Sequence, residues 1–193
     1  MIYYKLKASL NGYEERLNRT FLFRTDLDLD ELAFAILSMF NTDAYHMYEF
    51  EDDSNKYECE ISLSEAIEMG YPDCGKKTEN VTLDKLKIKR DKFIMTYDFG
   101  ENYEFVIEVL GTIEIKGRNR IPVVIDGVGY GILEDNRSLL EAYLDGEIEF
   151  PNKINRRGRY VAIDFDYFSV NECNEKMKRE ISIIRQGYLF YNL

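Results

Sequence analysis

The acidic residues of two turn-like segments are the strongest candidates for chemistry in this sequence. The segment YDFGENYEF carries Asp98 and Glu101, and the segment GILEDN carries Glu134 and Asp135. Carboxylate oxygens are the ligands that hard cations such as Mg²⁺ prefer, and paired carboxylates also serve hydrolytic reactions. If these four side chains gather at one end of a sheet, they predict a metal-dependent hydrolase or a nucleic-acid-processing enzyme.

The first segment also has a structural explanation. Asp98 can accept hydrogen bonds from backbone N–H groups two or three residues further on, and Gly100 can supply the positive φ that a hairpin loop needs. Under this interpretation the segment is a hairpin turn that could also serve as a binding edge. The sequence favours the structural interpretation and leaves the chemical one open.

The sequence offers few residues for nucleophilic catalysis. The chain contains one histidine, His46, so any Ser-His-Asp or Cys-His arrangement would have to include it. The three cysteines, Cys59, Cys74 and Cys173, are widely spaced and form neither a disulfide framework nor a CxxC metal motif. We expect reduced, partly buried thiols. The leading interpretation therefore contains no catalytic residue, no metal and no cofactor.

Composition limits the class of protein and its partners. The 193 residues, 45% of them hydrophobic, suffice for a single domain spanning 1–193. The formal net charge of −11 repels phosphate backbones, so nucleic acid is not the expected partner. Two basic segments, 76–92 and 153–159, are most simply solvated loop faces, and they could dock an acidic partner or a nucleic-acid end only if they converge in space. No stretch is apolar enough to span a bilayer and no signal region opens the chain, which predicts no membrane association and a cytoplasmic location.

The spacing of apolar side chains predicts the elements that must position the acidic residues. Alternation predicts strands at 2–10, 16–24, 45–51, 56–61, 93–97, 103–111 and 159–165. Helical spacing predicts helices within 25–41, 62–70, 137–146 and 169–184, and glycines make 119–136 a loop-rich stretch. Because most strands are joined by short links, we expect an α+β fold with a mainly antiparallel β-sheet and helices packed on one face.

Four short motifs follow one another in a distinctive order: NRTFLF with Arg19, HMYEF with His46, YDFGE with Asp98 and Glu101, and ILEDN with Glu134 and Asp135. In this order they resemble the plasmid pRiA4b ORF-3-like family, over roughly 1–180. The resemblance implies an α+β fold with an antiparallel sheet and a loose association with plasmids and mobile elements. It implies no established activity.

The chain departs from the family pattern beside the hairpin turn. Tyr103 stands where the family has tryptophan, and Phe105 stands where it often has histidine. Ile132 and Leu133 replace two prolines of the acidic loop. If the family's hairpin histidine does chemistry, this chain has lost it.

The leading functional hypothesis is a non-catalytic binding or adaptor protein that recognises a partner peptide or a small ligand. The 15 tyrosines and 12 phenylalanines suit it, because such side chains at a surface provide contact area, and the aromatic hairpin of 93–109 would form that surface. The candidate ligand-binding residues are Arg19, His46, Asp98, Glu101, Tyr103, Glu134 and Asp135. The alternative is the metal-dependent enzyme that uses the clustered carboxylates.

Overall fold

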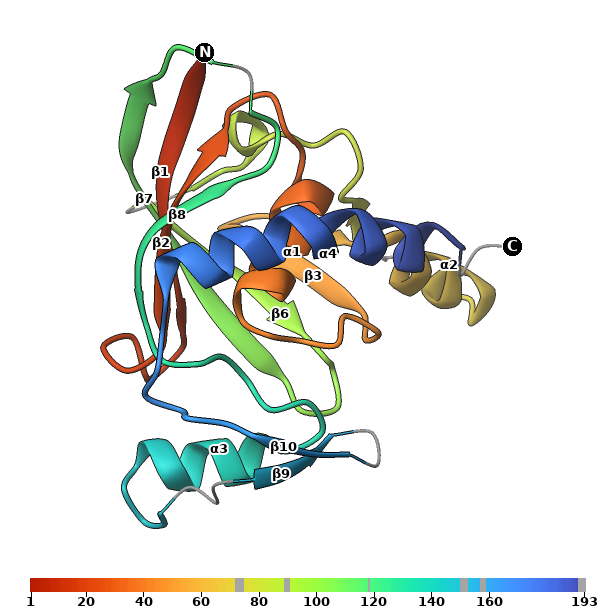
Figure 1. Cartoon of the computed structure of the whole chain (residues 1–193). Helices are drawn as coiled ribbons and strands as arrows, with labels where there is room; N and C mark the ends of the chain where they lie inside the picture. The colour runs from red at the N-terminus through yellow and green to blue at the C-terminus, as the bar shows by residue number, and fades with distance from the viewer. Residues whose placement is uncertain (72–74, 89–90, 118, 150–152, 157–158, 191–193) are drawn as a thin grey trace.

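A computed structural model describes residues 1–71, 75–88, 91–117, 119–149, 153–156 and 159–190. Its centre is an eight-stranded sheet in the order β5-β4-β3-β6-β7-β1-β2-β8 (Figure 1). Only the short β4–β5 pair is parallel among the described strands, so the expected antiparallel sheet is confirmed. The strands are β1 (Ile2–Leu10), β2 (Asn18–Arg24), β3 (Tyr48–Glu51), β4 (Lys56–Glu58), β5 (Lys76–Lys77), β6 (Lys92–Tyr97), β7 (Tyr103–Glu114) and β8 (Val123–Val128).

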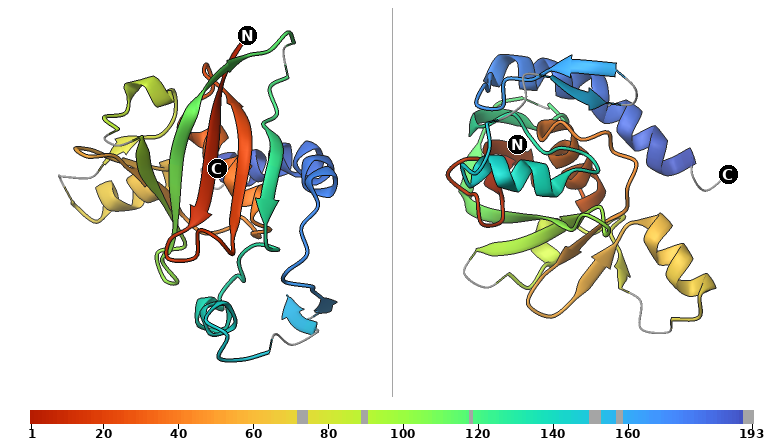
Figure 2. Two further views of the ribbon diagram at one scale, coloured as in Figure 1. Left: turned by 90° about the vertical axis from the view of Figure 1, so that its left-hand side faces the viewer. Right: turned by 90° about the horizontal axis from the view of Figure 1, so that it is seen from below.

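Two helices cover one face of this sheet, α1 (Leu29–Met39) and α4 (Val170–Phe190) (Figure 1). The helix α2 (Glu60–Glu68) lies towards the β5 side, and α3 (Arg137–Leu144) lies beside the two-stranded sheet of β9 (Lys153–Arg156) and β10 (Arg159–Ala162) (Figure 2). The α+β class is therefore confirmed. No helix within the described ranges is long and apolar enough to cross a membrane.

The helix α1 forms where its sequence predicts it. Asp28 caps its N-terminus by accepting a 3.1 Å hydrogen bond from the backbone N–H of Glu31. Nearly every residue from Leu29 to Met39 is buried, because the sheet lies on one side of α1 and α4 packs against the other. This layering places the loop after α1 at the end of the sheet where the hairpin of β6 and β7 turns.

In the β6–β7 hairpin Phe93 pairs with Ile107, Met95 with Phe105 and Tyr97 with Tyr103. All six side chains are at most 3% exposed. They belong to the hydrophobic core, so this row of aromatic side chains is not available as the surface for a partner that the sequence suggested.

The loop-rich interpretation of 119–136 is wrong in part, because this stretch contains the edge strand β8. The strand pairs with β2, and the side-chain amide of Asn174 bonds both the N–H and the C=O of Val124 at 2.9 Å. The partners of β8, which are β2 and Asn174, are distant in sequence, whereas the glycines that suggested a loop lie within the stretch itself. Strand 56–61 is also shorter than expected, since α2 begins at Glu60, and β9 was not predicted.

The two basic segments do not converge. The described part of 76–92 spans β5 and the start of β6, whereas the described part of 153–159 belongs to β9 and β10 at the opposite end of the molecule (Figures 1 and 2). Arg157 lies outside the described residues. A joint docking surface made of both segments is therefore not formed.

Candidate metal centre

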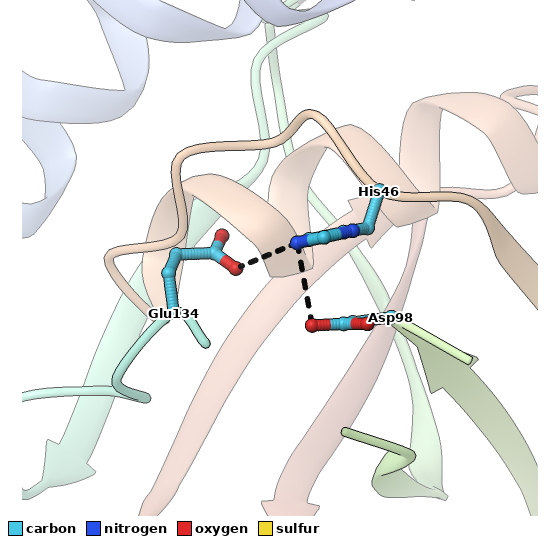
Figure 3. A group of neighbouring side chains, drawn as sticks. All are labelled: His46, Asp98 and Glu134. Atoms are coloured by element: carbon cyan, nitrogen blue, oxygen red, sulfur yellow. Dashed lines mark ion pairs between the residues drawn. The ribbon is translucent and has the colours of Figure 1, made fainter. Parts of the chain in front are cut away.

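Three side chains from separate loops meet at the end of the sheet (Figure 3). His46 comes from the loop between α1 and β3, Asp98 from the turn after β6, and Glu134 from the loop that leads to α3. The His46 Nε2 atom lies 3.3 Å from Asp98 Oδ2 and 3.9 Å from Glu134 Oε2. One ligand atom from each residue lies within 4.8 Å of the other two.

The two carboxylate oxygens of Asp98 have different roles. Oδ1 accepts the backbone N–H groups of Gly100 at 3.1 Å and Glu101 at 3.3 Å, as the structural interpretation predicted. The positive φ values belong to Asp98 (57°) and Asn102 (55°) and not to Gly100, so that part of the prediction is wrong. With Oδ1 committed to the turn, Oδ2 is left facing the imidazole ring.

The two carboxylate oxygens of Glu134 also have different roles. Its Oε1 atom accepts the hydroxyl of Tyr97 at 2.8 Å and the backbone N–H of Asp43 at 2.6 Å. Burial raises the pKa of the Glu134 carboxyl above its ordinary value, and these hydrogen bonds oppose that rise. The second oxygen, Oε2, points at His46.

The imidazole ring is held by aromatic neighbours. The Tyr45 ring lies 4.1 Å from it between centroids, and the Tyr97 ring meets it edge-on at 5.8 Å. The hydroxyl of Tyr188, near the end of α4, donates a hydrogen bond to the backbone carbonyl of His46. Both the ring and its backbone are thus fixed in the orientation that presents Nε2 to the two carboxylates.

Two carboxylate oxygens that face His46 are buried. Within the described residues neither Asp98 Oδ2 nor Glu134 Oε2 makes a hydrogen bond, although the side chains are only 5% and 6% exposed. An imidazole Nε2 carries at most one proton and cannot satisfy both oxygens, and leaving a charged acceptor unsatisfied is costly. A metal ion bound at about 2.0–2.2 Å from each ligand holds such atoms about 3–4 Å apart, and the two distances from His46 Nε2, 3.3 Å and 3.9 Å, lie in that range.

Asp135 lies at the solvent side of the centre. Its Oδ1 atom is 3.2 Å from His46 Nε2, its other oxygen accepts the Tyr45 hydroxyl, and its side chain is 63% exposed. Glu101 instead points towards α3, where it accepts the backbone N–H of Arg137 at 2.8 Å. Three of the four carboxylates considered together in the sequence therefore gather around His46.

Two further candidate residues support the loops and do not reach the centre. Tyr103 is buried and donates its hydroxyl to the carbonyl of Leu133 at 2.6 Å, next to Glu134. Arg19 is fully buried and donates to five backbone carbonyls, those of Asn18, Met39, Val128, Gly129 and Tyr130. Sequence reasoning did not identify the supporting hydroxyls of Tyr97 and Tyr188, because only tertiary contacts reveal them.

A sequence model described as plasmid pRiA4b ORF-3-like protein matches residues 3–145, which is most of the chain. This chain belongs to the plasmid pRiA4b ORF-3-like family. The matched span contains His46, Asp98 and Glu134 but ends before α4 and Tyr188.

A crystal structure of a protein of unknown function from Methanosarcina mazei Go1 shows a similar fold. That protein shares 18% sequence identity, with a TM-score of 0.65 over 89% of this chain and 96% of its own. At this identity the likeness concerns the fold alone. The comparison with curated proteins found no match.

Proposed function

We propose that this member of the pRiA4b ORF-3-like family binds one divalent metal ion through His46, Asp98 and Glu134 and uses it in a hydrolytic reaction. One observation carries the proposal: two buried carboxylate oxygens face the same imidazole nitrogen and have no hydrogen-bond partner in the part of the chain that the structure describes. A cation would satisfy all three atoms at once, which a proton on Nε2 does not do.

The donor set favours a particular group of ions. One imidazole nitrogen with two carboxylate oxygens suits Zn²⁺ or Mn²⁺, whereas Mg²⁺ prefers oxygen ligands and keeps several waters. The sequence suggested Mg²⁺ because only carboxylates were taken as ligands. Because His46 joins the set, zinc is the ion that we expect to bind most tightly.

The number of protein ligands favours chemistry over a purely structural role. Structural zinc sites usually have four protein ligands, whereas catalytic sites have three and leave a position open for water or substrate. The His46 side chain is 27% exposed and Asp135 is 63% exposed, so this side of the centre faces solvent. A bound divalent ion lowers the pKa of a coordinated water towards about 7, so that a hydroxide nucleophile forms near neutral pH.

A non-catalytic binding or adaptor role stays a prediction. The aromatic hairpin that would have received a partner is buried, so such a role would need another surface. The metal-dependent alternative is supported by a defined set of atoms, and for this reason we favour it.

Metal binding can be tested by titrating chelator-treated protein with Zn²⁺, Mn²⁺ and Mg²⁺ in a calorimeter. We expect one equivalent of Zn²⁺ to bind and to raise the melting temperature. Glu134→Gln should weaken zinc binding by about tenfold or more, whereas Glu147→Gln, which changes an exposed residue after α3, should not. Equal zinc affinity in both variants would contradict the proposal.

Hydrolysis can be tested with p-nitrophenyl acetate as a generic ester probe. The zinc-loaded protein should hydrolyse it faster than the metal-free protein, and His46→Ala should lose this difference. If zinc binds but the rate does not change, the ion has another role and the hydrolytic part of the proposal fails.

A further inference from the structure

Hydrogen bonds tie the loop that carries Glu134 to the β6–β7 hairpin on both sides of that residue. Before Glu134, the hydroxyl of Tyr103 donates to the carbonyl of Leu133 at 2.6 Å. After Glu134, the backbone N–H of Arg137 donates to the carboxylate of Glu101 at 2.8 Å. The hairpin that presents one carboxylate ligand therefore holds the loop that presents the other.

The contact between Glu101 and Arg137 is reciprocal, and we call it the clasp. The guanidinium of Arg137 donates to the carbonyl of Glu101 at 3.0 Å and to the carbonyl of Asn102. In the described part of the chain, the N-cap residue of α3, Asn136, makes no capping bond with its side chain, and the Glu101 carboxylate serves the start of this helix instead. The clasp thus holds the start of α3, shortly after Glu134, against the hairpin turn.

The clasp also reaches Asp98 through the backbone of the turn. The N–H of Glu101 donates to Oδ1 of Asp98 at 3.3 Å, and the N–H of Asn102 donates to the Asp98 carbonyl at 2.5 Å. The two residues whose carbonyls Arg137 holds therefore both contact Asp98. Movement of the turn relative to α3 would change the distance between Asp98 and Glu134, and the clasp resists that movement.

The bonds within these segments leave one oxygen of each carboxylate ligand for an ion. Oδ1 of Asp98 and Oε1 of Glu134 each accept two hydrogen bonds, and turning either carboxylate to offer both oxygens would break them. Zn²⁺ binds about four ligands at about 2.0–2.2 Å and depends on where they lie. Mn²⁺ favours a larger, oxygen-rich shell that water can fill. A fixed pair of single oxygens therefore favours zinc.

We propose that the clasp of Glu101 and Arg137 sets the spacing of the two carboxylate ligands and so strengthens the preference of the centre for Zn²⁺ over Mn²⁺. The inference rests on the proposed metal site and names the residues that determine its ion. Both are positioning residues, because they bond each other and do not join the cluster of His46, Asp98 and Glu134. The sequence placed Glu101 among the candidate ligands, and the clasp gives it a different role at the same centre.

Three variants test the clasp by calorimetric titration of chelator-treated protein with Zn²⁺ and Mn²⁺. Glu101→Ala should weaken zinc binding by about tenfold or more and manganese binding by less, because zinc depends more on ligand placement. Glu101→Gln removes the charge but keeps an oxygen that can accept the Arg137 N–H, so it should restore most of the zinc affinity. Glu141→Ala removes a carboxylate that lies 2.7 Å from Nε of Arg137 outside the clasp, and it should bind both ions as the wild type does.

The comparison of Glu101→Ala with Glu101→Gln separates ligand placement from charge. If both variants lose the same zinc affinity, the effect is one of charge and the inference is wrong. If Glu101→Ala binds zinc as tightly as the wild type, the clasp does not position the ligands. Either result overturns this inference alone, whereas failure of zinc to bind the wild-type protein overturns the proposed function as well.

Amide hydrogen exchange of the metal-free protein gives a readout that does not depend on an ion. The backbone N–H of Asp43 donates to Oε1 of Glu134 at 2.6 Å, so its exchange rate reports whether that carboxylate stays in place. We expect this amide to exchange about tenfold faster in Glu101→Ala than in Glu141→Ala, whereas the amides of β1 should exchange alike. Arg137→Gln, which opens the clasp from the other side, should give the same acceleration. Equal exchange of the Asp43 amide in all of these variants would overturn the inference.

Discussion

Tyr97 donates a 2.8 Å hydrogen bond from its hydroxyl to Oε1 of Glu134, while the next residue along the chain, Asp98, faces the same imidazole ring as Glu134. Two consecutive residues at the end of β6 therefore serve the centre in different ways. Asp98 offers an oxygen, and Tyr97 orients the other carboxylate. Burial and the negative charge of Glu134 raise the pKa of Tyr97, so the hydroxyl stays protonated and remains a donor.

Tyr97→Phe should weaken zinc binding by about tenfold, because Glu134 loses the donor that fixes its orientation while the ring keeps its packing. Calorimetric titration of the variant with Zn²⁺ measures this change. Tyr167→Phe, which alters an exposed tyrosine bonded to Glu172, is the matched control and should bind zinc as the wild type does. Unaltered zinc affinity in Tyr97→Phe would show that Glu134 needs no such support.

Tyr188→Phe should lower both zinc affinity and stability by small amounts. The hydroxyl of this α4 residue donates to the carbonyl of His46, and its loss leaves that part-buried acceptor without this bond. We expect the free energy of unfolding to fall by about 1 kcal/mol, as measured by urea denaturation of the metal-free protein. A loss of stability with no change in zinc binding would mean that α4 supports the fold and not the position of His46.

Arg19→Lys should be strongly destabilising, by about 3 kcal/mol or more. Burial lowers the pKa of Arg19 to about 10, so it is still charged at neutral pH, and its guanidinium satisfies five backbone carbonyls. Lysine has three donors on one atom and cannot reproduce that fan of contacts. Urea denaturation measures the effect, and a loss below about 1 kcal/mol would contradict this structural role.

Asp52 should make stability depend on acidic pH. Burial alone would raise its pKa, but hydrogen bonds from the backbone N–H groups of Lys87, Ser54 and Asn55 outweigh burial and lower the pKa to about 2. Because the folded-state pKa lies below the unfolded value, the stabilisation is present above about pH 4 and is lost as the pH falls towards 2.

Asp52→Asn should therefore remove much of that pH dependence. Its free energy of unfolding at pH 7 should fall by about 1–3 kcal/mol, since an amide oxygen accepts these bonds less strongly. Urea denaturation at pH 3 and at pH 7 compares the two proteins. Parallel losses of stability in variant and wild type over this interval would assign the acid sensitivity to other groups.

The sequence predicts those elements whose signals are local. Apolar residues at helical spacing within 25–41 predict α1, and alternating apolar residues at 93–97 and 103–111 predict the two strands of the β6–β7 hairpin. Strand β8 escapes such reasoning because its partners, β2 and Asn174, are distant in sequence. Its glycine-containing sequence is typical of a loop, and tertiary pairing overrides that preference.

The candidate site is predictable residue by residue but not as an arrangement. His46, Asp98, Glu134 and Asp135 are each marked by a motif, yet their convergence depends on how three loops end at the same edge of the sheet. The turn sequence predicts the backbone hydrogen bonds to Asp98. It does not predict that Tyr97 and Asp43 donate to one oxygen of Glu134 and leave the other facing His46.

The central claim is that one metal ion lies between His46, Asp98 and Glu134, and anomalous diffraction from a crystal of the zinc-loaded protein tests it most directly. We predict one strong peak at the zinc absorption edge, about 2.0–2.2 Å from Nε2 of His46, Oδ2 of Asp98 and Oε2 of Glu134. A zinc peak bound elsewhere, with this centre showing no anomalous signal, would contradict the account.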